Sequence, residues 1–230
     1  MRVPKETKQR NNIQIQRVHI DKPFLIPRLP VITNDKQRVS LIKQCEGICR
    51  SAIEYADLVS YLRKYADMNE CTFLNNFKAG SKRGMIEIHH SPFTLFDIVD
   101  IVIRRHEDVY HSIDDFDVCE EVLRLHYSGL VGLIPLSTTC HQLVHDDKLT
   151  VPLWCVYGRF VEFTKRYYDW IPDNTLAALM EDVKLSRKFK QNPELLKEAN
   201  KILDVKFVYL DVEGEQKIDK SLYASMKEMA

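Results

Sequence analysis

The 230-residue sequence has no apolar run of the roughly 18–20 residues that a membrane-spanning helix needs. Glycine and proline are scarce, at seven and nine residues, so the chain is neither collagen-like nor a flexible linker. Six cysteines are too few for a disulfide scaffold, and the opening MRVPKETKQR lacks the apolar segment of a secretory signal. These absences predict an intracellular protein that does not enter a membrane.

Net charge is also absent, because 33 basic residues balance 33 acidic ones, which argues against a general polyanion binder. The charges are nevertheless unevenly distributed. Residues 1–50 carry 11 basic and 4 acidic side chains, whereas residues 85–150 carry 4 basic and 12 acidic ones. This division fits either charge complementarity within the molecule or an N-terminal arm that faces nucleic acid.

Apolar periodicity predicts a mostly helical α+β protein. Three prolines make residues 1–34 an extended basic arm, and a long helical segment occupies 35–80, with either a kink or a division into two abutting helices expected at Gly47. The next unit, 81–150, has short strands at MIEIHH and 131–136, and the C-terminal region, 151–230, is helical and ends in a strand at 206–212. The other predicted helices cover residues 94–107, 114–127, 138–147, 157–169, 174–190 and 193–203.

Four of the eight histidines stand out by their spacing. His89 and His90 are adjacent at the end of the first predicted strand. His141 and His145 are four residues apart on a predicted helix, so they share one face and can bind a single ion. The predicted order is a strand, a second strand and a helix, with imidazoles on the first strand and on the helix. This order predicts a compact metal-binding ββα unit.

The two blocks IEIHH and GLIPLSTTCHQLVH resemble the HNH endonucleases, also called ββα-metal or His-Me finger nucleases. Members of that family carry I-x-x-H-H in the first strand and N-L-I-P-L-C-x-x-C-H-x-x-x-H across the second strand and the helix. The resemblance implies an HNH module within residues 81–150, with a helical insertion at 94–127. It also implies a phage-encoded protein that acts in the host cytoplasm.

The resemblance implies a role for each histidine. His89, His141 and His145 match the three metal ligands, and His90 matches the general base that activates water. One divalent ion is expected as cofactor, with Zn, Ni or Mn favoured over Mg because nitrogen ligands suit them better. The implied activity is hydrolysis of DNA phosphodiester bonds, in which the ion acts as a Lewis acid.

The chain departs from the family pattern in two ways. The central Asn of the family falls on Gly132, so activity is lost or the role passes to Ser137 or Asn76. His90 and His141 are 51 positions apart, and the inserted helices between them could bind a protein partner. The alternative is therefore a catalytically degenerate HNH-fold protein that binds a metal. Such a protein would have a structural role or would bind nucleic acid or another protein. A helical interaction protein without metal is a third possibility.

Other residues give weaker indications. Cys45 and Cys49 are either core residues or half of a zinc site, and Cys140 is expected in the core. His106, His111 and His126 are expected on solvated faces or turns. The aromatic stretch 159–170 suits a core better than base stacking. Five basic residues are candidates for nucleic-acid contacts: Lys82, Arg83, Lys184, Arg187 and Lys188.

Overall fold

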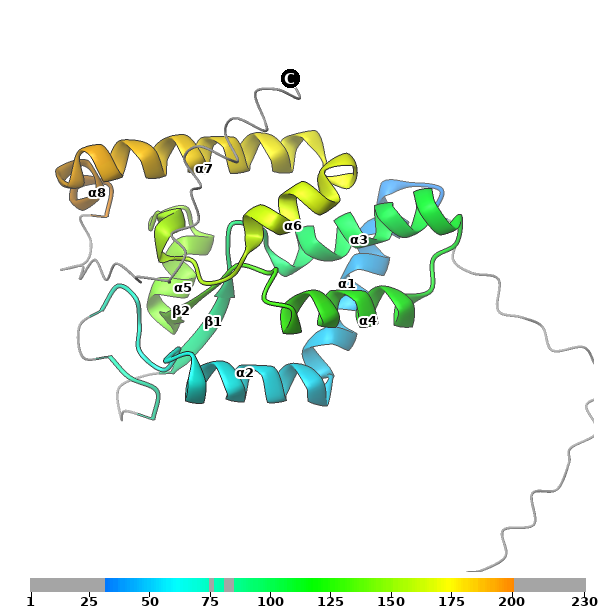
Figure 1. The fold of residues 1–230 in the computed structure, drawn as a ribbon, viewed down its shortest axis with the longest axis horizontal. Coiled ribbons are helices and arrows are strands. Elements are labelled where there is room, and N and C mark those ends of the chain that lie inside the picture. Colours follow the sequence, from blue (N-terminus) through cyan, green and yellow to red (C-terminus); the bar gives the residue numbers. More distant parts are fainter. Residues whose placement is uncertain (1–31, 75–76, 81–84, 201–230) are drawn as a thin grey trace, which may run out of the picture.

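The computed structural model describes residues 32–74, 77–80 and 85–200. This part of the chain is an α+β protein, mostly helical, with one small antiparallel sheet (Figure 1). None of its helices is long and apolar enough to span a membrane. The strands are β1 (Ile86–His90) and β2 (Leu133–Ser137). The helices are α1 (Asp35–Ser51), α2 (Ile53–Tyr65), α3 (Leu95–Tyr110), α4 (Asp115–Tyr127), α5 (Thr138–His145), α6 (Phe160–Tyr167), α7 (Asp173–Gln191) and α8 (Pro193–Ala199), with short 3₁₀ turns η1 (Leu153–Cys155) and η2 (Tyr168–Trp170).

The predicted long helical segment is two helices, and the break lies at Ala52 rather than at Gly47. Ala52 has an extended backbone, with ψ of 139°, so it ends α1 and begins α2. Gly47 stays within α1, where the helix tolerates it. Asn34 begins α1 by accepting a hydrogen bond from the backbone N–H of Gln37, which satisfies one of the free donors of the first turn.

The helices α1, α3 and α4 pack together and form the larger hydrophobic core. The middle of α3, from Ile98 to Ile103, is buried on almost every side. The segment 94–127, expected as a helical insertion, thus contributes to the core of the molecule. Its apolar content explains this, since a helix with such a wide apolar face must be covered by neighbours.

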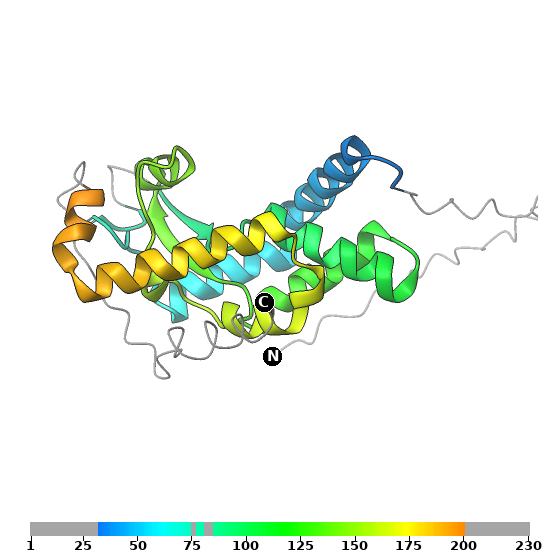
Figure 2. The same cartoon turned by 90° about the horizontal axis from the view of Figure 1, so that it is seen from above.

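The two strands lie between this helical core and α5, as both views show (Figures 1 and 2). They pair antiparallel, with His89 opposite Ile134 and His90 opposite Leu133. Successive side chains of a strand point to opposite faces. His89 therefore faces α5, and His90 faces the helical core.

The C-terminal part follows the sheet and returns along the molecule. The predicted helix 157–169 is divided into α6 and η2, and α7 then runs along the long axis of the molecule (Figure 2). Phe160, Phe163 and Tyr167 are buried, so this aromatic stretch serves the core. The predicted strand at 206–212 and most of the predicted arm, residues 1–31, lie outside the described residues.

Candidate metal centre

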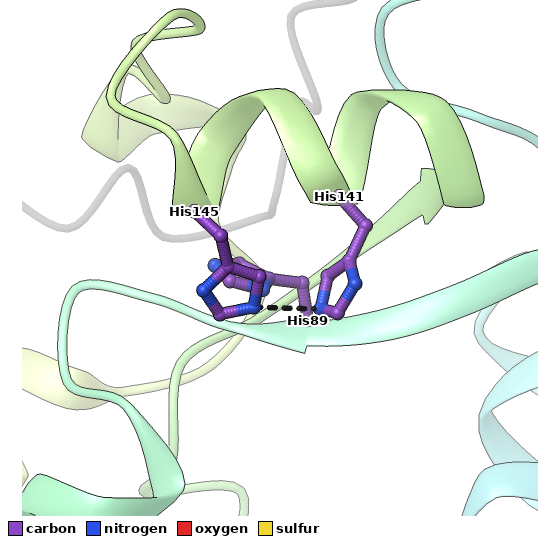
Figure 3. A group of neighbouring side chains, drawn as sticks. All are labelled: His89, His141 and His145. Carbon is purple, nitrogen blue, oxygen red and sulfur yellow. Dashed lines mark hydrogen bonds between the residues drawn. The ribbon is translucent and has the colours of Figure 1, made fainter.

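Three of the four singled-out histidines meet between β1 and α5. His89 extends from the strand, and His141 and His145 extend towards it from one face of the helix (Figure 3). One ligand atom from each side chain lies within 4.8 Å of the other two. The Nε2 atoms of His141 and His145 are 3.3 Å apart.

The helix that carries two of these imidazoles is fixed at its beginning and on its inner face. Ser137, the last residue of β2, accepts a hydrogen bond from the N–H of Cys140 and so caps α5. Cys140 is fully buried, in a small core that also contains Cys71 and Ile134. Cys140 faces this core as predicted, and His141, the next residue, points towards β1 (Figure 3).

A carboxylate that the histidine spacing does not indicate, Glu87, orients one of the ligands. Glu87 Oε2 accepts a hydrogen bond from His141 Nδ1 at 2.8 Å, which leaves Nε2 as the free lone pair. Glu87 is two residues before His89, so the two share a face of the strand. The alternation within IEIHH could have identified it.

The electrostatics keep His89 and His141 neutral and able to bind a metal. Burial, together with the nearby rings of His141 and His145, lowers the pKa of His89 to about 4. Burial also lowers the pKa of His141, although Glu87 opposes that shift. At neutral pH both rings thus offer lone pairs rather than protons.

This set of donors fits a divalent ion. Nitrogen ligands at about 2.0–2.1 Å in a tetrahedral site lie about 3.3–3.4 Å from one another. The Nε2 atoms of His141 and His145 already have this separation. His89 is buried, His141 is half-buried and His145 is exposed, so the cluster opens to solvent on one side. Three protein ligands with one open position are typical of catalytic rather than structural zinc sites.

The structure does not bring His90 to this cluster. Its side chain lies on the opposite face of β1, is only 6% exposed, and stacks beside Tyr55. His126 Nδ1 donates to the carbonyl of Val122, so His126 Nε2 accepts the hydrogen bond from His90 Nε2 at 2.9 Å. Burial and the neighbouring His126 hold the pKa of His90 well below its usual value.

Two of the histidines expected on solvated faces are in fact buried. His126 is the partner of His90, and His106 lies beside the carboxylate of Glu121 at 2.9 Å. His106 is on α3 and His126 is on α4. Apolar periodicity alone did not place either histidine on the buried face of its helix. His111 is exposed at the end of α3, as predicted for a turn.

Position 132 has no room for the asparagine of the family pattern. A Cβ atom there would lie 2.0 Å from the carbonyl oxygen of Ser91 and 2.8 Å from Val156 Cγ1. Ser137, one proposed substitute, is buried and occupied as the cap of α5. Asn76, the other, lies outside the described residues.

Of the remaining candidates, those that the structure describes do not join the imidazole cluster. Cys45 and Cys49 are fully buried in the helical core, where Cys119 faces them from α4. This position suits the core interpretation of the pair. Among the basic candidates, Lys184, Arg187 and Lys188 lie on α7, whereas Lys82 and Arg83 are outside the described part of the chain.

The fold and these side chains define a mostly helical α+β protein with a three-histidine candidate metal centre. Residues 2–213 match the family of bacteriophage G278-like virion proteins, and the chain belongs to that family. The predicted phage association is thereby confirmed. No curated protein and no solved structure matches the chain significantly.

Proposed function

We propose that this protein is a component of the phage particle that binds one divalent metal ion through His89, His141 and His145 and hydrolyses phosphodiester bonds in DNA. The three convergent imidazoles carry this proposal. The order of β1, β2 and α5 and the two sequence blocks that resemble HNH nucleases support it.

Each residue of the site would have a distinct role. His89 and the two helical histidines would hold the ion, and Glu87 would keep the ring of His141 in the orientation and tautomer that expose Nε2. A divalent ion held there supplies Lewis-acid polarisation of a phosphate oxygen. The exposed side of the cluster at His145 is where a phosphate could approach.

We do not assign to His90 the predicted role of general base. A general base must lie within hydrogen-bond reach of the water that it activates. In the structure His90 faces away from the three ligands, and its Nε2 is engaged by His126. The carboxylate of Glu87, which orients His141 and is 35% exposed, would instead accept the proton of the attacking water.

The second candidate function is a metal-bound structural module without catalysis. Two observations favour it: the burial of His90 and the lack of space at Gly132 for the family asparagine. In this case the ion would join α5 to β1 and so stabilise the surface that the virion protein presents to its neighbours.

Metal content and DNA cleavage distinguish these candidates. The purified full-length protein is analysed for bound metal and incubated with supercoiled plasmid and Mg, Mn, Ni or Zn in turn. We expect one ion per chain and metal-dependent nicking. His141→Ala should lose both, and Glu87→Gln should weaken metal binding by about 10- to 100-fold because the ligand is no longer oriented.

His111→Asn is the matched control, because it removes an exposed histidine outside the cluster and Asn tolerates the left-handed backbone found there. It should leave both measurements unchanged. One bound ion without cleavage by any metal would reject the nuclease and support the structural module. No bound metal in the unaltered protein would reject both.

A further inference from the structure

An open cleft lies between the C-terminal half of α3 and the turn that leads from α6 into α7. Four carboxylates line it: Glu107 and Asp108 on α3, Asp169 on η2, and Asp173 at the start of α7. Trp170 and Pro172 form its apolar wall. Arg104 is the one basic residue among the lining residues, and it pairs with Asp100.

Two of these carboxylates are already engaged and two are not. Glu107 pairs with Arg38, and Asp108 accepts a hydrogen bond from the indole Nε1 of Trp170 at 3.0 Å, which holds the ring in place. Asp169 and Asp173 are exposed and have no ion-pair partner within the described ranges. The cleft therefore presents an aromatic ring between two uncompensated negative charges.

The N-terminal segment joins the folded body beside this cleft. Arg38, in the first turns of α1, contacts Glu107, which lines the cleft, and Ile32 packs against the helical core. An extended chain spans about 3.3 Å per residue, so Pro30 lies within about 7 Å of Ile32, whereas Lys22 can lie up to about 33 Å away. Since Arg38 contacts Glu107, the described chain begins on the side of the molecule that carries the cleft.

The sequence of that segment complements the cleft. Residues 22–30, KPFLIPRLP, contain three prolines, four large apolar residues, Lys22 and Arg28, and no acidic residue. Pro27 and Pro30 have the P-x-x-P spacing of polyproline II ligands, which dock against aromatic side chains at little entropic cost. Basic residues in such a ligand would meet the free carboxylates.

We propose that residues 22–30 dock into the cleft of their own chain, with the prolines against Trp170 and Pro172 and with Lys22 and Arg28 facing Asp169 and Asp173. The short connection makes docking intramolecular, which raises the effective concentration of the ligand to the millimolar range. The charge division seen in the sequence would then be complementarity within one molecule. This inference is independent of the metal centre.

A cysteine pair tests the contact in the full-length protein. All six native cysteines are buried, so engineered surface thiols can be oxidised selectively. Leu29→Cys is combined with Asn174→Cys at the cleft, and for comparison with Ile53→Cys, an exposed site on α2. We expect an intramolecular disulfide to form about tenfold faster with the cleft position because docking raises the local thiol concentration.

Charge reversal provides the specific control. Lys22→Glu with Arg28→Glu should slow the cleft cross-link to the rate of the α2 pair, and adding Asp169→Lys with Asp173→Lys should restore it. Equal rates at the two positions would overturn the proposal, as would cross-linking that charge reversal leaves unchanged. A covalent dimer on a non-reducing gel would show that the segment belongs to a second copy, which also overturns docking within one chain.

Discussion

Gly132 shows how one small residue constrains the region beside the sheet. It lies immediately before β2, and its carbonyl accepts a hydrogen bond from the N–H of Ser91, the residue after β1. The space that a side chain would need is filled by the Ser91 backbone and by Val156. Backbone atoms cannot move aside as the end of a flexible side chain can, so this position requires glycine for packing.

Gly132→Ala is therefore expected to lower the free energy of unfolding by about 1–3 kcal/mol through overpacking. Gly47→Ala is the matched control, because a Cβ at Gly47 meets no atom within 4 Å. In the interior of α1 this change should instead raise the free energy of unfolding by about 0.5–1 kcal/mol. Urea unfolding followed by circular dichroism measures both. Similar effects of the two substitutions would contradict the assigned role of Gly132.

At the scale of elements, the contact between α4 and β1 depends on two neutral histidines. His126 on the helix and His90 on the strand share a hydrogen bond, and Tyr55 from α2 packs against both rings. Burial lowers the pKa of His126 to about 4, although its hydrogen bond to the Val122 carbonyl opposes the shift. Protonation of either ring would place a charge within the core.

Acid should therefore weaken this contact. The folded-state pKa of His126 lies below its ordinary value, so the unfolded chain binds the extra proton first, and stability falls as the pH drops from about 6.5 towards 4. His126 contributes a loss of up to about 3 kcal/mol over that interval. Urea unfolding at several pH values should show a shallower dependence for His126→Gln. An unchanged slope would mean that another group causes the acid sensitivity.

At the scale of the whole molecule, the candidate metal centre links parts of the chain that are distant in sequence. His89 is on β1 and His141 is on α5, and the core helices α3 and α4 come between them in the sequence. The basic beginning and acidic middle of the chain also meet directly, since Arg38 pairs with Asp100 and Glu107. Complementarity within the molecule, one of the two explanations of the charge division, is thus present at this point.

An ion that binds only the folded chain should stabilise it against heat. At a free-metal concentration 100-fold above Kd, the gain is about 2.7 kcal/mol. Addition of a chelator should lower the Tm, and addition of zinc should restore it, whereas His145→Ala should respond to neither. A His145→Ala variant that still responds would show that the ion binds elsewhere.

Much of the secondary structure followed from local sequence, because apolar periodicity and capping residues act over a few positions. The strand at MIEIHH, the helices capped by Thr94 and Asp114, and the i, i+4 pair His141 and His145 are all of this kind. The break at Ala52 was missed because an extended alanine has no sequence signal comparable to glycine or proline.

The sequence by itself determined the helical character, the strand at MIEIHH and the shared helix face of His141 and His145, since each depends on spacing within one element. Only the tertiary structure decided that α3 and α4 form the core, that His90 turns away from the ligands to meet His126, and that Glu87 orients His141. These outcomes depend on which faces of distant segments pack together. Such packing is set by burial and by hydrogen bonds that join residues 36 and 54 positions apart, which no local pattern records.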